Sequence, residues 1–209
     1  MEASDPLQPP PPPSFDAVGA VDYPVDLNCP RQDRYNRFLP LIKWLLVLPH
    51  VLVLAVLFIG VVFAKIAAFF VVLFTGRYPR GIFDFVASVF RWSWRVSSYV
   101  MLLTDRYPPF SLAEDADHPA TLRIDYPEDG IARWRPLVQW LLVIPYAIVA
   151  GVLHSVAGIV AFIGVFVILF TEELPQGMYE LILIPNRWSM RSVAYGGFMV
   201  DRYPPFEWK

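Results

Sequence analysis

A duplication constrains this chain more than any local motif. The six residues at 201–206, Asp-Arg-Tyr-Pro-Pro-Phe, repeat residues 105–110 at an offset of 96 positions, 201 minus 105. The same offset carries Arg91–Arg95 onto Arg187–Arg191. The chain is therefore one unit present twice. We predict a disordered proline-rich tail at residues 1–20, a first repeat at 21–112 and a second repeat at 113–209.

The composition is that of a membrane protein. Of the 209 residues, 56% are hydrophobic and 17% are charged, and the mean hydropathy is +0.45. Soluble domains have about 45–50% apolar and about 25% charged residues. The net charge of −2 gives no positive field that would attract nucleic acid. A bilayer is therefore the expected partner, and nucleic acid is not.

The tail contains a proline run, Pro9–Pro13. Such a run is an extended polyproline segment or is disordered, and a ligand for a proline-reading domain is the alternative. The acidic first residues lack the basic region and apolar core of a secretory signal, so we expect no cleaved leader.

Each repeat opens with a short segment in which apolar and polar residues alternate. In the first repeat it covers 21–27, and in the second it covers 121–126. A period of two residues predicts strands, and the two could pair outside the membrane. Pro24 would keep the first strand at an edge of the sheet.

A long apolar run follows in each repeat, after a basic collar that includes Arg31, Arg34, Arg37 and Lys43 in the first copy and Arg133 and Arg135 in the second. The runs, Trp44–Phe74 and Trp140–Phe170, have 31 residues each. A straight helix of that length is roughly 46 Å long, whereas the hydrocarbon core measures about 30 Å. Pro49 and Pro145 lie at matching positions, and each could kink its helix and leave the first turns in the interface.

A second helical segment follows a proline-containing turn and covers about 82–103 and 178–200. In the first copy its polar residues have spacings of four, three, four and three, which place them on one helix face. They are Asp84, Ser88, Arg91, Arg95 and Ser98, and the second copy keeps Glu180, Arg187 and Arg191. The segment could be an interfacial amphipathic helix, or it could span the bilayer with the stripe turned into a bundle.

Direct repeats with matching ends favour the same orientation for both copies. Two spans per copy then place both collars and both motifs, 105–110 and 201–206, on one side of the membrane. These segments are rich in arginine, and because cytoplasmic loops carry an excess of positive charge, we expect that side to be the cytoplasm. We therefore predict an all-α integral membrane protein, a tandem duplication with about two membrane-embedded helices per copy plus short extramembrane strands. The location is the cell (inner) membrane, multi-pass, with cytoplasmic termini. The alternative is a shallow hairpin from each apolar run, with the arginine-bearing helix on the surface.

The arginine pairs are the candidate functional residues, because buried arginines in a bilayer need a partner or a task. Arg91, Arg95, Arg187 and Arg191 could converge on an anion or a lipid headgroup. The structural alternative is ion pairing with Asp84 and Glu180. Lys65, a lone cation in the first run, is expected to snorkel. The Asp-Arg-Tyr-Pro-Pro-Phe motif is expected to stop the helix and to pack against the collar.

Signatures of catalysis, metal binding and nucleotide binding are missing from the sequence. We therefore expect no enzyme, no cofactor and no metal. The first hypothesis is a structural or accessory membrane protein that binds lipid headgroups or a membrane partner, and a homo-oligomer or larger membrane complex is compatible with it. The alternatives are a small transporter or channel with an arginine-lined anion path, and a membrane-shaping hairpin protein.

With the repeat laid out, the chain resembles a bacterial family of membrane proteins of unknown function. The resemblance rests on Arg-Trp-x-x-Arg within a helix and Asp-Arg-Tyr-Pro-Pro-Phe at its end, in two tandem copies. It covers nearly everything after the proline-rich tail. It implies a bacterial membrane location and implies no activity and no catalytic residues.

Overall fold

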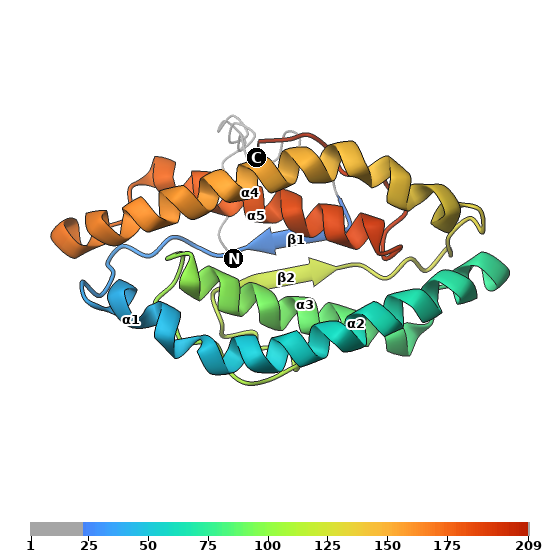
Figure 1. The fold of residues 1–209 in the computed structure, drawn as a ribbon, viewed down its shortest axis with the longest axis horizontal. Coiled ribbons are helices and arrows are strands. Elements are labelled where there is room, and N and C mark those ends of the chain that lie inside the picture. The colour runs from blue at the N-terminus through green and yellow to red at the C-terminus, as the bar shows by residue number, and fades with distance from the viewer. Residues whose placement is uncertain (1–22, 209) are drawn as a thin grey trace, which may run out of the picture.

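The computed structural model describes residues 23–208, so the predicted tail at 1–20 lies outside the described residues. The elements in chain order are β1 (Val25–Asn28), α1 (Leu39–Leu46), α2 (Leu48–Thr75), α3 (Arg80–Val100), β2 (Thr121–Ile124), α4 (Arg135–Thr171) and α5 (Gln176–Gly196). Each repeat therefore consists of a strand, a long apolar helix and a second helix, as predicted (Figure 1).

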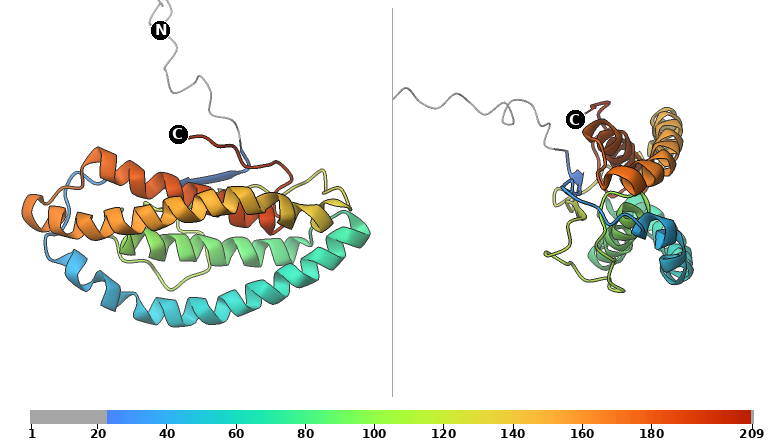
Figure 2. Two further views of the ribbon diagram at one scale, coloured as in Figure 1. Left: turned by 45° about the horizontal axis from the view of Figure 1, so that its top comes forward. Right: turned by 90° about the vertical axis from the view of Figure 1, so that its left-hand side faces the viewer.

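The elements form three layers (Figures 1 and 2). The long helices α2 and α4 make one outer layer, α3 and α5 lie beneath them, and the two strands cover the opposite side of α3 and α5. The middle helices are buried around most of their circumference; α3 alone buries Phe83, Val86, Phe90, Trp94 and Tyr99. The same helix also buries Arg95 and Ser98 of its polar stripe, so α3 belongs to the core on both its apolar and its polar sides.

The strands exchange partners between the repeats. β1 pairs with β2 in antiparallel fashion, with Leu27 opposite Leu122, which confirms the predicted pairing. β1 of the first repeat packs on α5 of the second, and β2 packs on α3. Facing residues of a strand pair lie on the same side of the sheet, and Val25 faces Ile124 while Leu27 faces Leu122. The buried positions are therefore the first and third of β1 and the second and fourth of β2.

The two copies run antiparallel to each other, contrary to the predicted common orientation. At one end of the molecule, the amide of Tyr35 in the first collar donates to the carbonyl of Glu172 in the second turn, at 2.9 Å. At the other end, the amide of Ile131 donates to the carbonyl of Gly76, at 2.7 Å. Each end therefore holds one collar and one turn. The charge contrast used to orient the termini does not arise, because the collars lie at opposite ends.

Proline affects the two long helices differently. In the first copy, the helix is interrupted at Val47, two residues before Pro49, so that α1 and α2 are separate elements. In the second copy, Pro145 lies inside the continuous helix α4. The predicted kink therefore becomes a break in only one of the repeats.

The long helices leave their apolar side chains exposed. Residues Leu39–Thr75 and Arg135–Thr171, 37 residues each, are the two stretches of the described chain that are long and apolar enough to cross a membrane, and only 22% of the most apolar window in each is buried. The most exposed large side chains include Leu52, Val56, Phe63, Phe70 and Phe74 in α2, and Ile148, Val152, Ile159, Phe162 and Phe170 in α4. Core helices of soluble proteins are mostly buried, so these two are unlike them.

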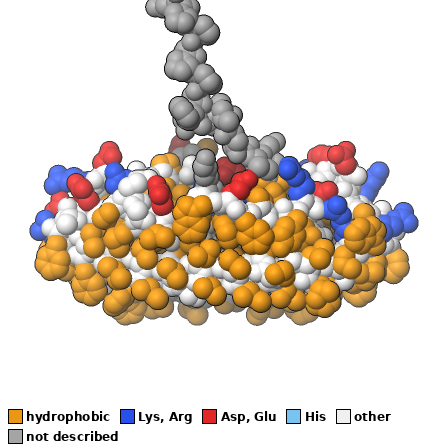
Figure 3. All heavy atoms as spheres, turned by 90° about the horizontal axis from the view of Figure 1, so that it is seen from above, with side chains coloured by type: hydrophobic (Ala, Val, Ile, Leu, Met, Phe, Trp, Pro, Cys, Tyr) orange, Lys and Arg blue, Asp and Glu red, His pale blue; other side chains and the backbone are white. Residues whose placement is uncertain are grey.

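The exposed apolar side chains lie on one face of the molecule. Figure 3 shows them along the α2 and α4 side, while charged side chains follow the opposite edge and both ends. β1, β2 and the C-terminal segment lie on that charged side (Figure 2). The molecule therefore has an apolar face and a polar face, and both run parallel to the helices.

Candidate functional site

The first arginine of each pair binds the strand of the other repeat. Arg91 Nε donates to the carbonyl of Leu122 at 3.4 Å, and Arg187 Nε donates to the carbonyl of Leu27 at 3.2 Å. These two leucines face each other in the sheet. The arginines therefore tie each middle helix to the strand pair. They face the polar layer and point away from the apolar face of the molecule.

The second arginine of each pair is buried but differs between the copies. Arg95, 3% exposed, donates through its two terminal nitrogens to the carbonyls of Ser111 and Ala113, at 2.5 and 3.3 Å. Arg191, 6% exposed, lies over the ring of Tyr23, with its central carbon 5.1 Å from the ring centroid. Its Nε and Nη1 have no hydrogen-bond acceptor among residues 23–208.

The acidic residues of the predicted pairs lie elsewhere. Asp84 is exposed near the start of α3, and Glu180 accepts a hydrogen bond from Gln176 within α5. Arg91 pairs instead with Glu114 of the linker, at 2.9 Å. Sequence spacing placed Asp84 on the face of Arg91, but it could not reveal that the linker folds back over that face.

A polar cavity of about 400 Å³ lies beside the first arginine pair. Its lining includes Arg91, Arg95 and Arg123 together with Asp26, Glu114 and Asp115. Three cations therefore face three carboxylates, and their charges balance. Such a lining does not favour an anion, and the arginines of the second pair are not part of it. Among residues 23–208, no three histidine, cysteine or acidic side chains lie close enough together to hold a metal ion.

The two copies differ at one buried position, where the first has an ion pair and the second has a neutral hydrogen bond. Lys43, 1% exposed, donates to the carbonyl of Thr104 at 2.7 Å and lies 2.8 Å from Asp105 Oδ1. At the equivalent place, Gln139 donates to the carbonyl of Val200 at 2.6 Å. Lys43 is therefore not a headgroup-contacting member of the collar. It holds the start of the Asp-Arg-Tyr-Pro-Pro-Phe motif.

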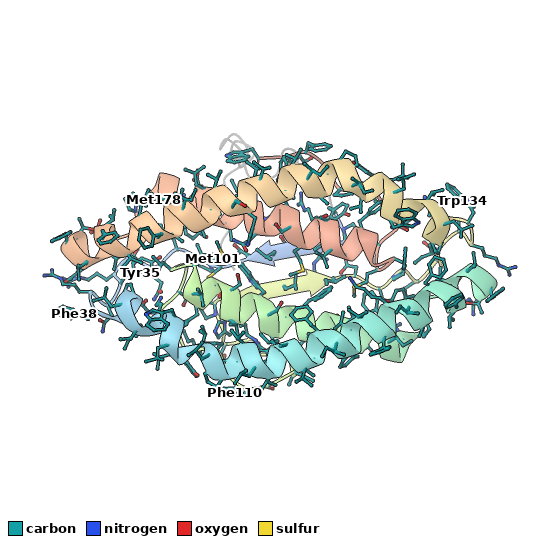
Figure 4. All side chains as sticks on the ribbon, viewed as in Figure 1. Tyr35, Phe38, Met101, Phe110, Trp134 and Met178 are labelled. Carbon is teal, nitrogen blue, oxygen red and sulfur yellow. The ribbon has the colours of Figure 1, made fainter. Side chains whose placement is uncertain are left out.

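The rest of that motif closes an aromatic cluster in each repeat. In the first copy, His50 stacks on Phe110 with ring centroids 3.7 Å apart, and Trp92 Nε1 donates to His50 Nδ1 at 3.2 Å. Phe110 is labelled in Figure 4 beside α2. In the second copy, Tyr146 takes the place of His50 and lies near Trp188 and Phe206, with centroids 5.5 and 4.9 Å apart.

The motif residues therefore turn back onto their own repeat. Tyr107 completes the first cluster and donates its hydroxyl to the carbonyl of Leu46 at 3.1 Å, where α1 ends. The motif was expected to pack against the collar, but its phenylalanines pack on His50 and Tyr146, which were not among the predicted partners. The signal was their common offset of 96 positions and their place directly after the two prolines.

A family model matches the chain twice, over residues 40–111 and 133–207, and its description is domain of unknown function DUF4389. The chain belongs to this family. Each DUF4389 match covers the long helix, the middle helix and the aromatic cluster of one repeat and leaves out its strand. No curated protein and no solved structure matches the chain.

Proposed function

We propose that this DUF4389 protein is a non-enzymatic structural protein that is embedded through one face in a single leaflet of a membrane. In this arrangement the long helices lie along the membrane plane. Their apolar side chains enter the acyl layer, and the strands, linkers and described chain ends face the water. The observation that supports this proposal is the separation of apolar and polar side chains onto two faces parallel to the helices (Figure 3).

An upright arrangement with four spans fits the geometry less well. The strand layer covers α3 and α5 along the middle of the molecule, where an upright bundle would meet the hydrocarbon core. Asp26, Glu114 and Arg123 are exposed there. Charged groups at the centre of a bilayer cost about 2.5–3.5 kcal/mol each on insertion scales.

The internal symmetry supports the same orientation. The two copies are related by an approximate twofold that places a collar and a turn at each end. When the helices lie in the membrane plane, this twofold runs along the membrane normal, and both copies present the same apolar side to lipid. The exposed apolar area also far exceeds the scattered hydrophobic residues of a soluble monomer.

Insertion into one leaflet favours the membrane-shaping hypothesis over an anion path. A slab that occupies area in only one leaflet expands that leaflet relative to the other, and the helices α1 and α2 together form an arc (Figure 2). Arg91, Arg95 and Arg187, by contrast, donate to strand and linker carbonyls instead of lining a channel, and Arg191 lies over the ring of Tyr23. We expect the purified protein to narrow or tubulate vesicles and to leave anion flux at the level of empty vesicles.

Sidedness tests the orientation. The native Cys29 thiol is fully buried, and burial raises its pKa to about 12, so it gives little labelling background. A cysteine at Asp33 marks one end of the molecule, and a cysteine at Arg77 marks the other. We expect an impermeant thiol reagent to reach both positions from the same side of sealed vesicles. Labelling from opposite sides would refute in-plane insertion and would support upright spans.

A further inference from the structure

One cation lies on the apolar side of the molecule without an acidic partner among residues 23–208. Lys65 of α2 reaches across to the second repeat, where Nζ is 3.4 Å from the carbonyl of Val193 and 5.1 Å from the centroid of the Phe90 ring. Its ammonium ends at α5, in the middle layer, and does not reach the strands on the polar face, as a lysine that snorkels to water would. An ammonium group without a nearby negative charge is costly in an apolar setting, and a bound anion would lower that cost.

A cavity lies beside this lysine. Its volume is about 210 Å³, and its lining includes Phe90 and Val193, which both contact Nζ. Phe58 and Val193 are exposed at the surface, whereas Leu27 of β1 is fully buried at the inner end. The cavity therefore leads from the apolar side of the molecule toward the strand layer, between the two repeats.

The inner wall of the cavity carries neutral polar groups. Ser93 and Ser97 come from α3, and Asn186 and Ser189 come from α5. The Asn186 amide nitrogen donates to the sulfur of Met101 at 3.2 Å, and Figure 4 places Met101 between the two repeats. The lining contains no carboxylate. The hydroxyls of Ser93 and Ser97 already donate to the Phe90 carbonyl and the Met101 sulfur, and the Asn186 amide also donates to the Ile182 carbonyl. These groups therefore leave the binding of an anion to Lys65.

The site is built only once despite the duplication. Lys65 packs against Gly197, where an added Cβ would lie 2.8 Å from both Cε and Nζ of the lysine. At the equivalent positions, 96 residues away, the chain has Ala161 in place of Lys65 and Met101 in place of Gly197. The lysine and the glycine that makes room for it thus occur together, in one half of the molecule.

We propose that this cavity binds a fatty acid taken from the leaflet, with its carboxylate at Lys65 and its acyl chain along the apolar side between α2 and the second repeat. One lysine matches the single negative charge of a carboxylate. This inference rests on the proposed membrane insertion, which brings the mouth of the cavity into contact with acyl chains.

Binding of radiolabelled palmitate to the purified full chain in detergent tests the proposal. We expect one palmitate per chain, and at least a tenfold weaker affinity in Lys65→Met. Gly197→Ala should weaken binding similarly, because the new Cβ displaces the lysine. Ala161→Met, the same residue type placed at the equivalent position of the second repeat, should bind palmitate like the native protein. Hexadecanol, which has the chain without the charge, should fail to displace palmitate.

The outcomes separate this proposal from membrane insertion. Equal palmitate binding by the native chain and Lys65→Met would overturn the fatty-acid site, as would tighter binding of dioctanoyl phosphatidylglycerol than of palmitate. Lys65→Met should still float with vesicles as the native protein does, because the apolar face is unchanged. Loss of flotation by the native chain, with palmitate binding retained, would instead contradict the proposed insertion alone.

Discussion

The two repeats share one framework but satisfy it with different chemistry. The first repeat uses charge at buried positions, where Lys43 pairs with Asp105 and Arg95 binds two linker carbonyls. The second repeat uses a neutral amide, Gln139, at the first of these positions. The comparison shows that the framework needs a donor, and not a charge, at the position of Lys43 and Gln139, whereas both copies keep an arginine at the position of Arg95 and Arg191.

The largest expected difference concerns the Lys43 position. Lys43→Met removes one partner of a buried ion pair, and we expect it to reduce the free energy of unfolding by about 3–5 kcal/mol. Gln139→Met removes a neutral donor and should cost about 1–3 kcal/mol. Denaturant titration in detergent measures both.

The double variant Lys43→Gln with Asp105→Asn makes the first pair neutral, whereas the second repeat keeps an aspartate, Asp201, at the position of Asp105 and pairs it with Arg135. This double variant should recover most of the stability that Lys43→Met loses. A double variant no more stable than Lys43→Met would show that the charge itself is required in the first repeat.

The buried arginines should also differ. Arg95→Gln removes charge-assisted hydrogen bonds to Ser111 and Ala113, and we expect a loss of about 1.5–3 kcal/mol in the free energy of unfolding. Arg191→Gln removes a cation–π contact with Tyr23, worth about 0.5–2 kcal/mol. Parallel thermal unfolding of both variants checks the order, and a larger loss for Arg191→Gln would contradict the comparison.

The turns after the long helices give a smaller contrast. Gly76 has φ +73°, and an added Cβ would lie 3.2 Å from the carbonyl oxygen of Ile131. Gly76→Ala should therefore cost about 1–2 kcal/mol. Glu172 occupies the equivalent position with φ 60°, and its carboxylate pairs with Arg34 and Arg37, both at 2.7 Å.

Glu172→Gly relieves the left-handed backbone strain but removes both exposed ion pairs, so its unfolding midpoint should stay close to that of the native protein. The measurement is the same denaturant titration used for Gly76→Ala. A strong destabilisation by Glu172→Gly alone would show that the ion pairs, not the backbone, set the stability of this turn.

The smallest effect concerns pH. His118 is buried in the linker, and burial together with Arg95 and Arg106 lowers its pKa, while Asp115 opposes that shift. Its Nδ1 accepts a hydrogen bond from the amide of Ala120 at 3.1 Å, which requires the unprotonated ring nitrogen. The stabilising contribution is therefore complete above the ordinary histidine pKa of about 6.5 and declines as the pH falls below it.

His118→Asn keeps an acceptor for the Ala120 amide and removes the titration. We expect the unfolding midpoint of the native protein to fall more between pH 7.5 and 5.5 than that of His118→Asn. Identical pH profiles would show that His118 does not contribute to acid sensitivity.

The repeats, the apolar runs and the strand pairing are predictable from the sequence, because each depends on repetition or local periodicity. Proline chemistry predicted a kink in both long helices, but only the first copy has an interruption, at Val47. The sequence does not predict that the copies run antiparallel, since a direct repeat in sequence carries no information on how two folded units dock. The strand exchange decides this orientation, and it depends on contacts between residues as distant as Leu27 and Arg187. The linker carboxylate Glu114 was missed as the partner of Arg91 for the same reason.

The central claim is that the long helices lie in the plane of one leaflet. Spin labels at Leu52, Val62 and Phe74, which are exposed along α2, measure its depth in vesicles through accessibility to oxygen and to a water-soluble nickel complex. In-plane insertion predicts similar depths at all three positions. A deep maximum at Val62 with shallow values at Leu52 and Phe74 would contradict it and would establish a spanning helix.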